Sequence, residues 1–223
     1  MLRLALTCVA AVAFAAVACT SGIQYPGELV GSFDTTLIAS SNGCTQFADL
    51  PGFCADNGSP GPCEDGGYPD AGTTVLVVSS GAGDAGYISY QSGSQSATSN
   101  GTFNGQTVVT QAVAQRLFVL NNQPSQDAGC VATVTETILL TMYSSLDAGC
   151  QGGIPSGPPP TQIDGVWQTQ ESPACGLLVD SVVPNGNGLC CPAPLPDGGC
   201  GTPPPPNCAV SFLLVGQGRP SPP

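Results

Sequence analysis

The cysteines are the residues whose number and spacing could carry the most chemistry in this chain of 223 residues. There are twelve, and Cys8 lies in an apolar N-terminal segment that export would remove. Zinc bound by cysteine alone needs close pairs such as Cys-x2-Cys. No such spacing occurs here, and the nearest cysteines, Cys190 and Cys191, are directly adjacent. The spacing therefore predicts disulfides, formed in an oxidising compartment. The candidates are Cys44, Cys54, Cys63, Cys130, Cys150, Cys175, Cys190, Cys191, Cys200 and Cys208.

Two long segments without strand character, 42–72 and 184–207, hold six of these cysteines. Loops of this length are uncommon in compact domains unless something holds them in place. We expect disulfides to brace both loops, with pairing inside each loop as the simplest arrangement. The full connectivity stays open, and the adjacent Cys190 and Cys191 are expected to bond to different partners.

Histidine and lysine are absent from the chain. Ser-His-Asp and Cys-His triads, Ser-Lys dyads, Schiff bases and histidine metal sites are therefore excluded. Two carboxylates could still act on a glycosidic bond, and a cleft holding two facing acids beside Trp167, Tyr87 or Tyr90 would favour such an enzyme. We assign no catalytic residue, metal ligand or cofactor site. The acids outside the turn tripeptides include Glu28, Asp34, Glu64, Glu136, Glu171 and Asp180.

Clustered acids could also bind calcium. Glu64, Asp65 and Asp70 lie close together in the first cysteine-containing loop, although the EF-hand spacing and the glycine-rich calcium repeat are absent. The ordinary interpretation is that these are solvated turn residues. A calcium-stabilised adhesin remains an alternative.

Arg116 is the only cation in the body of the chain, and Glu136 is the only acid in the apolar run from Val131 to Tyr143. A hairpin centred near Gln126 would place these two side chains opposite each other. We predict a structural salt bridge that fixes the register. Arg116→Ala should then destabilise the protein, and adding Glu136→Ala should cost little more.

The charge balance excludes two classes of partner. Fifteen acids face three arginines, which gives a formal net charge of −12. Nucleic-acid binding and attachment to anionic lipid both need a basic patch, which this composition cannot supply.

The N-terminus has the pattern of an export signal. Arg3 precedes an apolar run of about 14 residues, too short to span a bilayer comfortably. The run ends in Ala16-Val17-Ala18-Cys19, which resembles the lipobox of bacterial lipoproteins, with Ala16 where that family usually has leucine. The resemblance implies a Gram-negative lipoprotein, acylated at Cys19 and held in the lipid bilayer, with Thr20 favouring the outer membrane. Cleavage by ordinary signal peptidase, giving a soluble secreted protein, is the alternative.

Short segments rich in β-branched and aromatic residues recur between glycine, asparagine, aspartate and proline clusters. They predict an all-β domain, either an antiparallel β-sandwich or a partly closed β-barrel with disulfide-braced long loops. The segment Val108–Leu120 also fits a helical stripe, but its β-branched residues favour a strand. The predicted strands are Leu29–Ala39, Thr73–Ser80, Gly86–Gln91, Gly101–Val113, Gln115–Asn121, Val131–Tyr143, Ile163–Thr169, Gly176–Val183 and Ala209–Gly216.

Turn chemistry repeats along the chain. The tripeptide Asp-Ala-Gly begins at four aspartates, and we expect each aspartate to cap a turn whose glycine has positive φ. Asn57-Gly58 and Asn100-Gly101 are likewise predicted turns. In Gly31–Thr35 and Gly165–Thr169, which share a Gly-x-aromatic-polar-Thr pattern, we expect the aromatic side chain to face the core. The four aspartates are Asp70, Asp84, Asp127 and Asp147.

We therefore expect a signal peptide over 1–18, a lipidated linker over 19–27, one β domain over 28–216 and a disordered tail over 217–223. The expected function is binding or envelope structure, with no enzyme activity and with the envelope ligand or protein partner unknown. The alternatives are a carbohydrate-active enzyme with paired carboxylates and the calcium-stabilised adhesin.

Overall fold

The computed structural model describes residues 23–45, 73–92, 95–118, 130–145, 150, 157–185 and 207–220. Every regular element in these ranges is a β-strand. The strands are β1 (Glu28–Asn42), β2 (Thr73–Ser80), β3 (Ala85–Ser92), β4 (Gln95–Phe103), β5 (Thr107–Phe118), β6 (Cys130–Met142), β7 (Gln162–Ile163), β8 (Val166–Trp167), β9 (Pro173–Pro184) and β10 (Cys208–Gly218).

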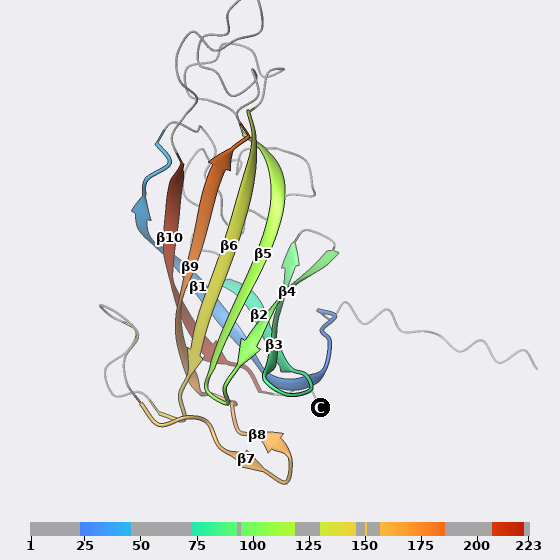
Figure 1. Cartoon of the computed structure of the whole chain (residues 1–223). Coiled ribbons are helices and arrows are strands. Elements are labelled where there is room, and N and C mark those ends of the chain that lie inside the picture. Colours follow the sequence, from blue (N-terminus) through green and yellow to red (C-terminus); the bar gives the residue numbers. More distant parts are fainter. Residues whose placement is uncertain are drawn as a thin grey trace, which may run out of the picture.

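Eight of the strands close into an antiparallel barrel in which sequence neighbours pair and β1 pairs with β10 (Figure 1). The remaining two, β7 and β8, form a small hairpin between β6 and β9. This confirms the all-β antiparallel class. Of the two expected architectures the barrel is correct and the sandwich is wrong, and the barrel is closed.

The alternating sequence explains why the barrel has an apolar interior. In β6 every second residue from Cys130 to Met142 is buried, while the residues between them, as far as Leu139, are half-buried on the outer face. Because successive side chains point to opposite faces of a strand, one face of each strand can fill the interior. The largest core residues include Phe33, Leu37, Leu76, Val78, Ile88, Phe103, Ile138, Leu140, Met142, Leu178, Phe212 and Leu214.

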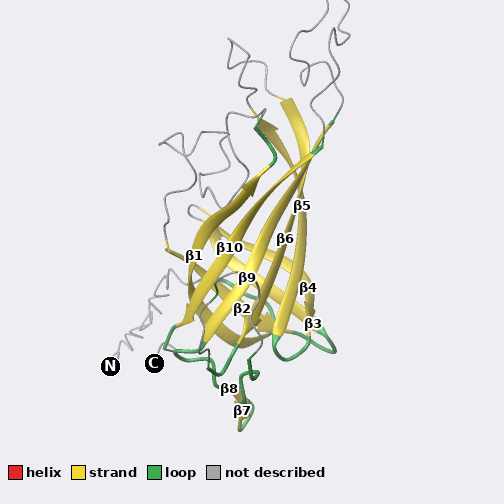
Figure 2. Ribbon diagram, turned by 90° about the vertical axis from the view of Figure 1, so that its left-hand side faces the viewer, coloured by secondary structure: helices red, strands yellow, loops and turns green. Residues whose placement is uncertain are grey.

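The two ends of the barrel differ. At one end lie the short turns 81–84 and 104–106, the β7–β8 hairpin, the start of β1 and the end of β10 (Figures 1 and 2). The strand ends that flank segments 46–72, 119–129 and 186–206 lie at the opposite end. We call the first the capped end, because residues 168–172 bond across it. Thr169 Oγ1 donates to the carbonyl of Val30 at 2.8 Å.

Several strand boundaries differ from the sequence prediction. Residues 95–100 were not predicted as strand, and Asn100-Gly101 lies inside β4 and not in a turn. The predicted strand Gly101–Val113 crosses the turn at Asn104–Gln106, while Gln115 and its neighbours continue β5. Ile163–Thr169 is the β7–β8 hairpin and the residues after it. Val108–Phe118 is strand, as predicted.

The assignment of residues 217–220 to a disordered tail is wrong, since the structure places them. Strand β10 includes Gln217 and Gly218. Arg219 then donates its backbone N–H to the carbonyl of Ser32, and its Nε lies 3.4 Å from Asp34 Oδ1. Both of these side chains are about half exposed, so the ion pair contributes little to stability.

The aspartate turns are only partly as expected. Of the four Asp-Ala-Gly copies, the one at Asp84 lies within the described residues, between β2 and β3. Positive φ occurs there at Gly83, before the aspartate, whereas Gly86 belongs to β3. The chain reversal therefore uses the glycine before the tripeptide, Gly83, and the last two residues of the tripeptide are the first two residues of β3.

Two disulfides lie within the described residues. Cys44–Cys208 joins the end of β1 to the start of β10, so it is a covalent link at the seam where the barrel closes. Cys150–Cys175 ties the segment after β6 to β9. Cys130 is disulfide-bonded as well. The expectation that Cys44 pairs within its own loop is wrong, because barrel closure brings it beside Cys208.

A second buried cluster surrounds one of these disulfides. Tyr143, Cys150 and Cys175 pack together, with Val215 against them. Burial raises the pKa of the Tyr143 hydroxyl, and a hydrogen bond with Thr141 offsets part of that rise. The folded protein therefore holds this proton more tightly than the unfolded chain does.

This raised pKa predicts a loss of stability in alkali. Above the unfolded tyrosine pKa of about 10, the unfolded chain binds fewer protons, so the free energy of unfolding falls as pH rises through the folded pKa. Guanidinium unfolding at pH 8 and at pH 11 should show a smaller fall for Tyr143→Phe than for the unchanged protein. Equal falls would contradict the assignment to Tyr143.

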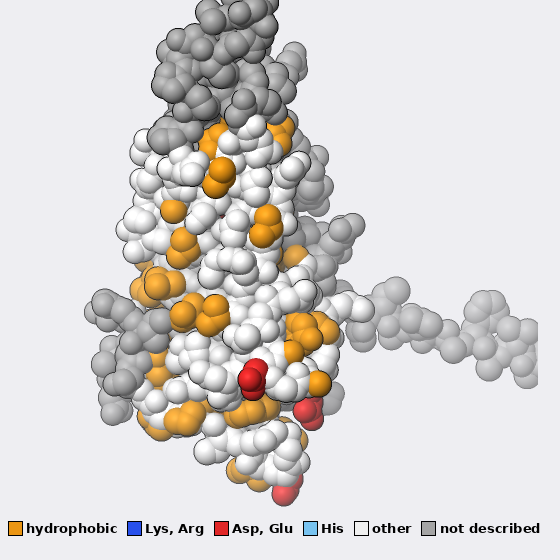
Figure 3. All heavy atoms as spheres, in the orientation of Figure 1, with side chains coloured by type: hydrophobic (Ala, Val, Ile, Leu, Met, Phe, Trp, Pro, Cys, Tyr) orange, Lys and Arg blue, Asp and Glu red, His pale blue; other side chains and the backbone are white. Residues whose placement is uncertain are grey.

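The face of the barrel in Figure 3 carries few charged side chains among its described residues. The face in Figure 3 carries hydrophobic side chains in separate patches among uncharged polar atoms, with its visible acidic side chains toward the capped end. Among the described residues, no helix is long and apolar enough to span a bilayer.

Candidate functional site

Two acids face each other inside the barrel. Glu136 on β6 and Asp180 on β9 are direct register partners, with 5% and 1% of their surface exposed. Both are among the acids that lie outside the turn tripeptides. The antiparallel pairing of β6 with β9 brings them together across 43 intervening residues. This is the pair of facing carboxylates that an acid-base mechanism would need, but it is closed off from solvent.

Tyr90 completes this interior cluster. Its hydroxyl donates to Glu136 Oε1 at 2.9 Å, and the ring is 9% exposed. Tyr90 belongs to β3, which pairs with β2 and β4, so its side chain reaches a strand that β3 does not pair with. A hydrogen bond to a buried carboxylate holds the ring in one position and satisfies the acid at the same time.

The predicted pairing of Arg116 with Glu136 across the ladder is wrong. Strands β5 and β6 do form an antiparallel hairpin, but Arg116 lies opposite Ala132, and Glu136 lies opposite Ala112. The hairpin is centred about two residues nearer the N-terminus than Gln126, so each predicted partner is displaced by four residues. Four residues of strand correspond to about 13 Å. The charged residue directly opposite Glu136 is instead Asp180, on the other neighbouring strand, β9.

Replacing Tyr90 tests the strength of the interior hydrogen bond. Tyr90→Phe should lower the free energy of unfolding by about 1 to 3 kcal/mol, because Glu136 loses a donor where water cannot replace it. Tyr87→Phe is the matched control on the outer face of the same strand, with an expected change within about 0.5 kcal/mol. Both are measured by guanidinium unfolding, and equal losses in the two variants would contradict the interior role of Tyr90.

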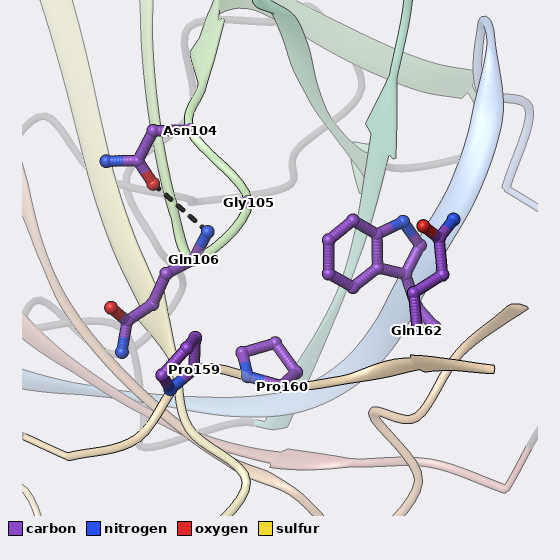
Figure 4. A pocket seen from close by; sticks show the side chains of 7 residues that line it. Asn104, Gly105, Gln106, Pro159, Pro160 and Gln162 are labelled. Atoms are coloured by element: carbon purple, nitrogen blue, oxygen red, sulfur yellow. Dashed lines mark hydrogen bonds between the residues drawn. The ribbon is translucent and has the colours of Figure 1, made fainter. Parts of the chain in front are cut away.

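A second candidate site is a cleft of about 480 Å³ at the capped end. Figure 4 shows Pro159 and Pro160 between the amides of Asn104 and Gln106 on one side and Gln162 on the other. The wall comes from the β4–β5 turn, from the segment before β7, and from β7 and β8. The lining residues are Asn104, Gly105, Gln106, Pro159, Pro160, Gln162 and Trp167.

Tight turns fix the two sides of this cleft. On one side, Asn104 Oδ1 accepts hydrogen bonds from the backbone N–H groups of Gln106 and Thr107, at 3.0 and 2.7 Å, while Gly105 has a φ of 91°. On the other side, Asp164 and Gly165 both have positive φ, as the two central residues of a type I′ hairpin turn do. Both turns are therefore set by local sequence.

The hairpin turn makes Gln162 and Trp167 register partners. The indole of Trp167 also packs edge-on against Phe103 of the core, with 5.5 Å between ring centroids and 70° between planes. Trp167 is thus half-buried and held by the barrel, whereas Phe33, its counterpart in the other Gly-x-aromatic stretch, is fully buried. The expectation that both rings face the core holds for Phe33 and only in part for Trp167.

Four polar groups of the cleft have no partner among the described residues. Gln106 Nε2 donates to the carbonyl of Gly157 at 3.1 Å, and Gln162 Nε2 donates to that of Gly165 at 3.0 Å. Their Oε1 atoms therefore remain as acceptors. The amide nitrogen of Asn104 and the indole N–H of Trp167 remain as donors. The cleft thus offers an aromatic surface, two acceptors and two donors, without a formal charge.

Within the described residues, the facing acids and the Trp167 cleft, which the carbohydrate-active alternative would combine, lie apart. The facing acids lie with Tyr90 inside the barrel, while Trp167 lines a cleft whose described walls hold no acid. Within the described residues there is no group of three or more potential metal ligands. Several predicted residues lie outside the described ranges: Cys19, Cys54, Cys63, Glu64, Asp65, Asp70, Cys190, Cys191 and Cys200.

The fold and the cleft define the protein as a closed eight-stranded antiparallel barrel with a capped end and an uncharged surface site. Comparisons of the chain with protein-family models, with curated proteins and with solved structures found no match. Its function must therefore be argued from its own residues.

Proposed function

We propose that the protein is an exported lipoprotein of the Gram-negative outer membrane, acylated at Cys19, and that its barrel is a binding module and not an enzyme. The cleft around Trp167 is the observation that carries this proposal. Its volume falls in the range of about 300 to 1,000 Å³ that small-ligand sites occupy. Its amide side chains are held by hydrogen bonds and its indole by contact with Phe103, so the site is preorganised.

Export is supported by the disulfides Cys44–Cys208 and Cys150–Cys175, because such bonds persist in oxidising compartments. Anchoring is supported by the lipobox-like residues before Cys19 and by the count of cysteines that follow it, which is even. Two acylation events would make such an anchor stable.

A binding role is favoured over the glycosidase alternative by the position of the acids. A substrate sugar must contact both carboxylates, and Glu136 and Asp180 are almost completely buried between β6, β9 and Tyr90. Their place among core residues is suited to fixing the barrel interior.

Intact mass tests the anchoring part of the proposal. The protein isolated from its native membranes should begin at Cys19, should carry added acyl mass, and should expose ten alkylatable cysteines only after reduction. A chain without added lipid would overturn the anchor. Thiols that react before reduction would overturn the fully paired state.

Trp167 supplies a test of the binding part, since it is the only tryptophan in the chain. Its emission reports on the cleft and on no other region. Fractionated envelope extract should shift this emission saturably, and the same fractions should protect it from quenching by acrylamide. If no fraction changes either signal, the binding role of the cleft is wrong.

A further inference from the structure

The cleft limits the charge of its ligand. Every described side chain that lines it is uncharged, and a charged ligand would lose hydration there without meeting an opposite charge. An uncharged ligand with many hydrogen-bonding groups has no such cost. The lining therefore selects against phosphate, carboxylate and amine ligands.

The aromatic surface limits the shape of the ligand. Trp167 packs against Phe103 with the two ring planes at 70° and is half-buried, and the part of its indole that lines the cleft gives it a flat apolar surface. Aromatic rings with a polar atom suit ligands that have one apolar side and one wet side. A sugar ring has this form, with C–H groups on its face and hydroxyl groups around its rim.

The free polar groups match hydroxyl chemistry. A hydroxyl group both donates and accepts, so it can pair with the acceptors Gln106 Oε1 and Gln162 Oε1 and with the donors Asn104 Nδ2 and Trp167 Nε1. Pro159 and Pro160 have no backbone N–H, so this wall cannot form a strand ladder with an extended peptide. Side-chain amides, not backbone ladders, provide the polar contacts here.

We infer, resting on the proposed function, that the cleft binds a neutral saccharide, with a sugar ring stacked on Trp167 and its hydroxyl groups bonded by Gln106, Gln162 and Asn104. The start of β1 lies at the same end of the barrel, so an anchor at Cys19 would hold the cleft near the membrane. The saccharide is therefore either a free oligosaccharide or the sugar headgroup of a membrane glycolipid.

The test uses the full mature protein in a detergent that has no sugar headgroup. Trp167 emission is titrated with neutral gluco-, galacto- and manno-oligosaccharides, with an acidic polygalacturonate, and with a proline-rich peptide. Vesicles containing a neutral glycolipid form a separate arm, compared with vesicles lacking it. We expect saturable binding of a neutral saccharide, and binding in the vesicle arm alone would identify the glycolipid as the source.

Variants assign the binding to the cleft. Gln162→Ala and Gln106→Ala should each weaken the affinity about tenfold, the equivalent of one lost hydrogen bond. Gln111→Ala, on the outer face of β5, is the matched control and should leave the affinity unchanged. Trp167→Ala, followed by calorimetry, should lose binding, and Trp167→Phe should retain part of it if the ring stacks. Circular dichroism checks that each variant folds.

The outcomes separate this inference from the proposed function. Saturation by envelope extract but by no neutral saccharide or glycolipid overturns the saccharide inference and leaves the binding role intact. Tighter binding of the acidic polymer or of the peptide has the same consequence. If neither the envelope extract nor any saccharide changes Trp167 emission, both the saccharide inference and the proposed binding role are overturned. Equal affinities in Gln162→Ala and Gln111→Ala would place the saccharide elsewhere and overturn the inference.

Discussion

Replacing Cys44 and Cys208 together by alanine should lower the free energy of unfolding by about 5 kcal/mol. The bond joins residues separated by 164 positions, and its loss frees the unfolded chain to sample far more conformations. It also lies where β1 and β10 close the barrel, next to the hydrogen bond from Gly43 N–H to the carbonyl of Ala209. At this chain length the change corresponds to a fall in melting temperature of about 10 to 20 °C.

The second disulfide provides a control of the same chemistry. Cys150 and Cys175 are separated by 25 positions, so replacing both should cost about 1.6 kcal/mol less than replacing Cys44 and Cys208. Guanidinium unfolding under non-reducing conditions, followed by Trp167 fluorescence, measures both double variants. A larger loss for the Cys150–Cys175 pair would show that local packing around Tyr143, and not loop length, sets the stabilisation.

The long strands could be predicted because their residues alternate strongly. The predicted strand Val131–Tyr143 differs from β6 by one residue at each end, and Thr73–Ser80 matches β2. Both are rich in β-branched residues that suit a half-buried pleated surface. The residues from Gln95 to Asn100 are mostly polar, include no large apolar side chain and carry no such pattern. They form a strand because Ala97 and Ser99 lie opposite Tyr90 and Ile88, a tertiary contact that local sequence does not reveal.

The turns that build the cleft could have been recognised from sequence. Asn104-Gly105 is a strong hairpin signal, and Asp164-Gly165 is another. The predicted strands Gly101–Val113 and Ile163–Thr169 nevertheless run through these two turns, because the residues around each turn also favour strands. Recognising them would have separated β4 from β5 and would have placed Trp167 on a hairpin. The cleft itself is formed by two stretches, 104–106 and 159–167, that lie far apart in the sequence, and no local pattern predicts that they meet.

The register of β5 and β6 could not be derived from the assumed hairpin centre. Equal and opposite charges at Arg116 and Glu136 suggested one register, but interior packing selects another, with Val108 opposite Leu140 and Thr110 opposite Ile138. Likewise, the sequence does not predict that Glu136 lies opposite Asp180, because the β7–β8 hairpin separates β6 from β9 along the chain. Strand pairing set by the packing of the whole barrel, and not by local sequence, therefore separates Arg116 from Glu136 and places Glu136 beside Asp180.

Replacing Gly101 by valine should prevent stable folding, and alanine there should cost about 3 kcal/mol or more. A Cβ atom at this position would lie 2.7 Å from the Cα atom of Thr110, and closer still to the carbonyl oxygen of Val109. Strands β4 and β5 would have to separate. Gly83→Ala is the control, because open space surrounds that position and only its φ of 67° opposes a side chain. Its expected cost is about 1 to 2 kcal/mol.

The position of Gly101 explains why this single contact should matter so much. Strands β4 and β5 pair through four residues each, the shortest ladder in the barrel, and Gly101 is one of the four. The same ladder ends at Phe103, which supports the indole of Trp167. Separating β4 from β5 should therefore open the barrel wall and, at the same time, displace the side of the cleft that Phe103 supports. Gly101→Ala should shift Trp167 emission in the folded state, whereas Gly83→Ala should not. A mild Gly101→Ala with unchanged emission would mean that the barrel tolerates separation at this ladder and that the cleft does not depend on it.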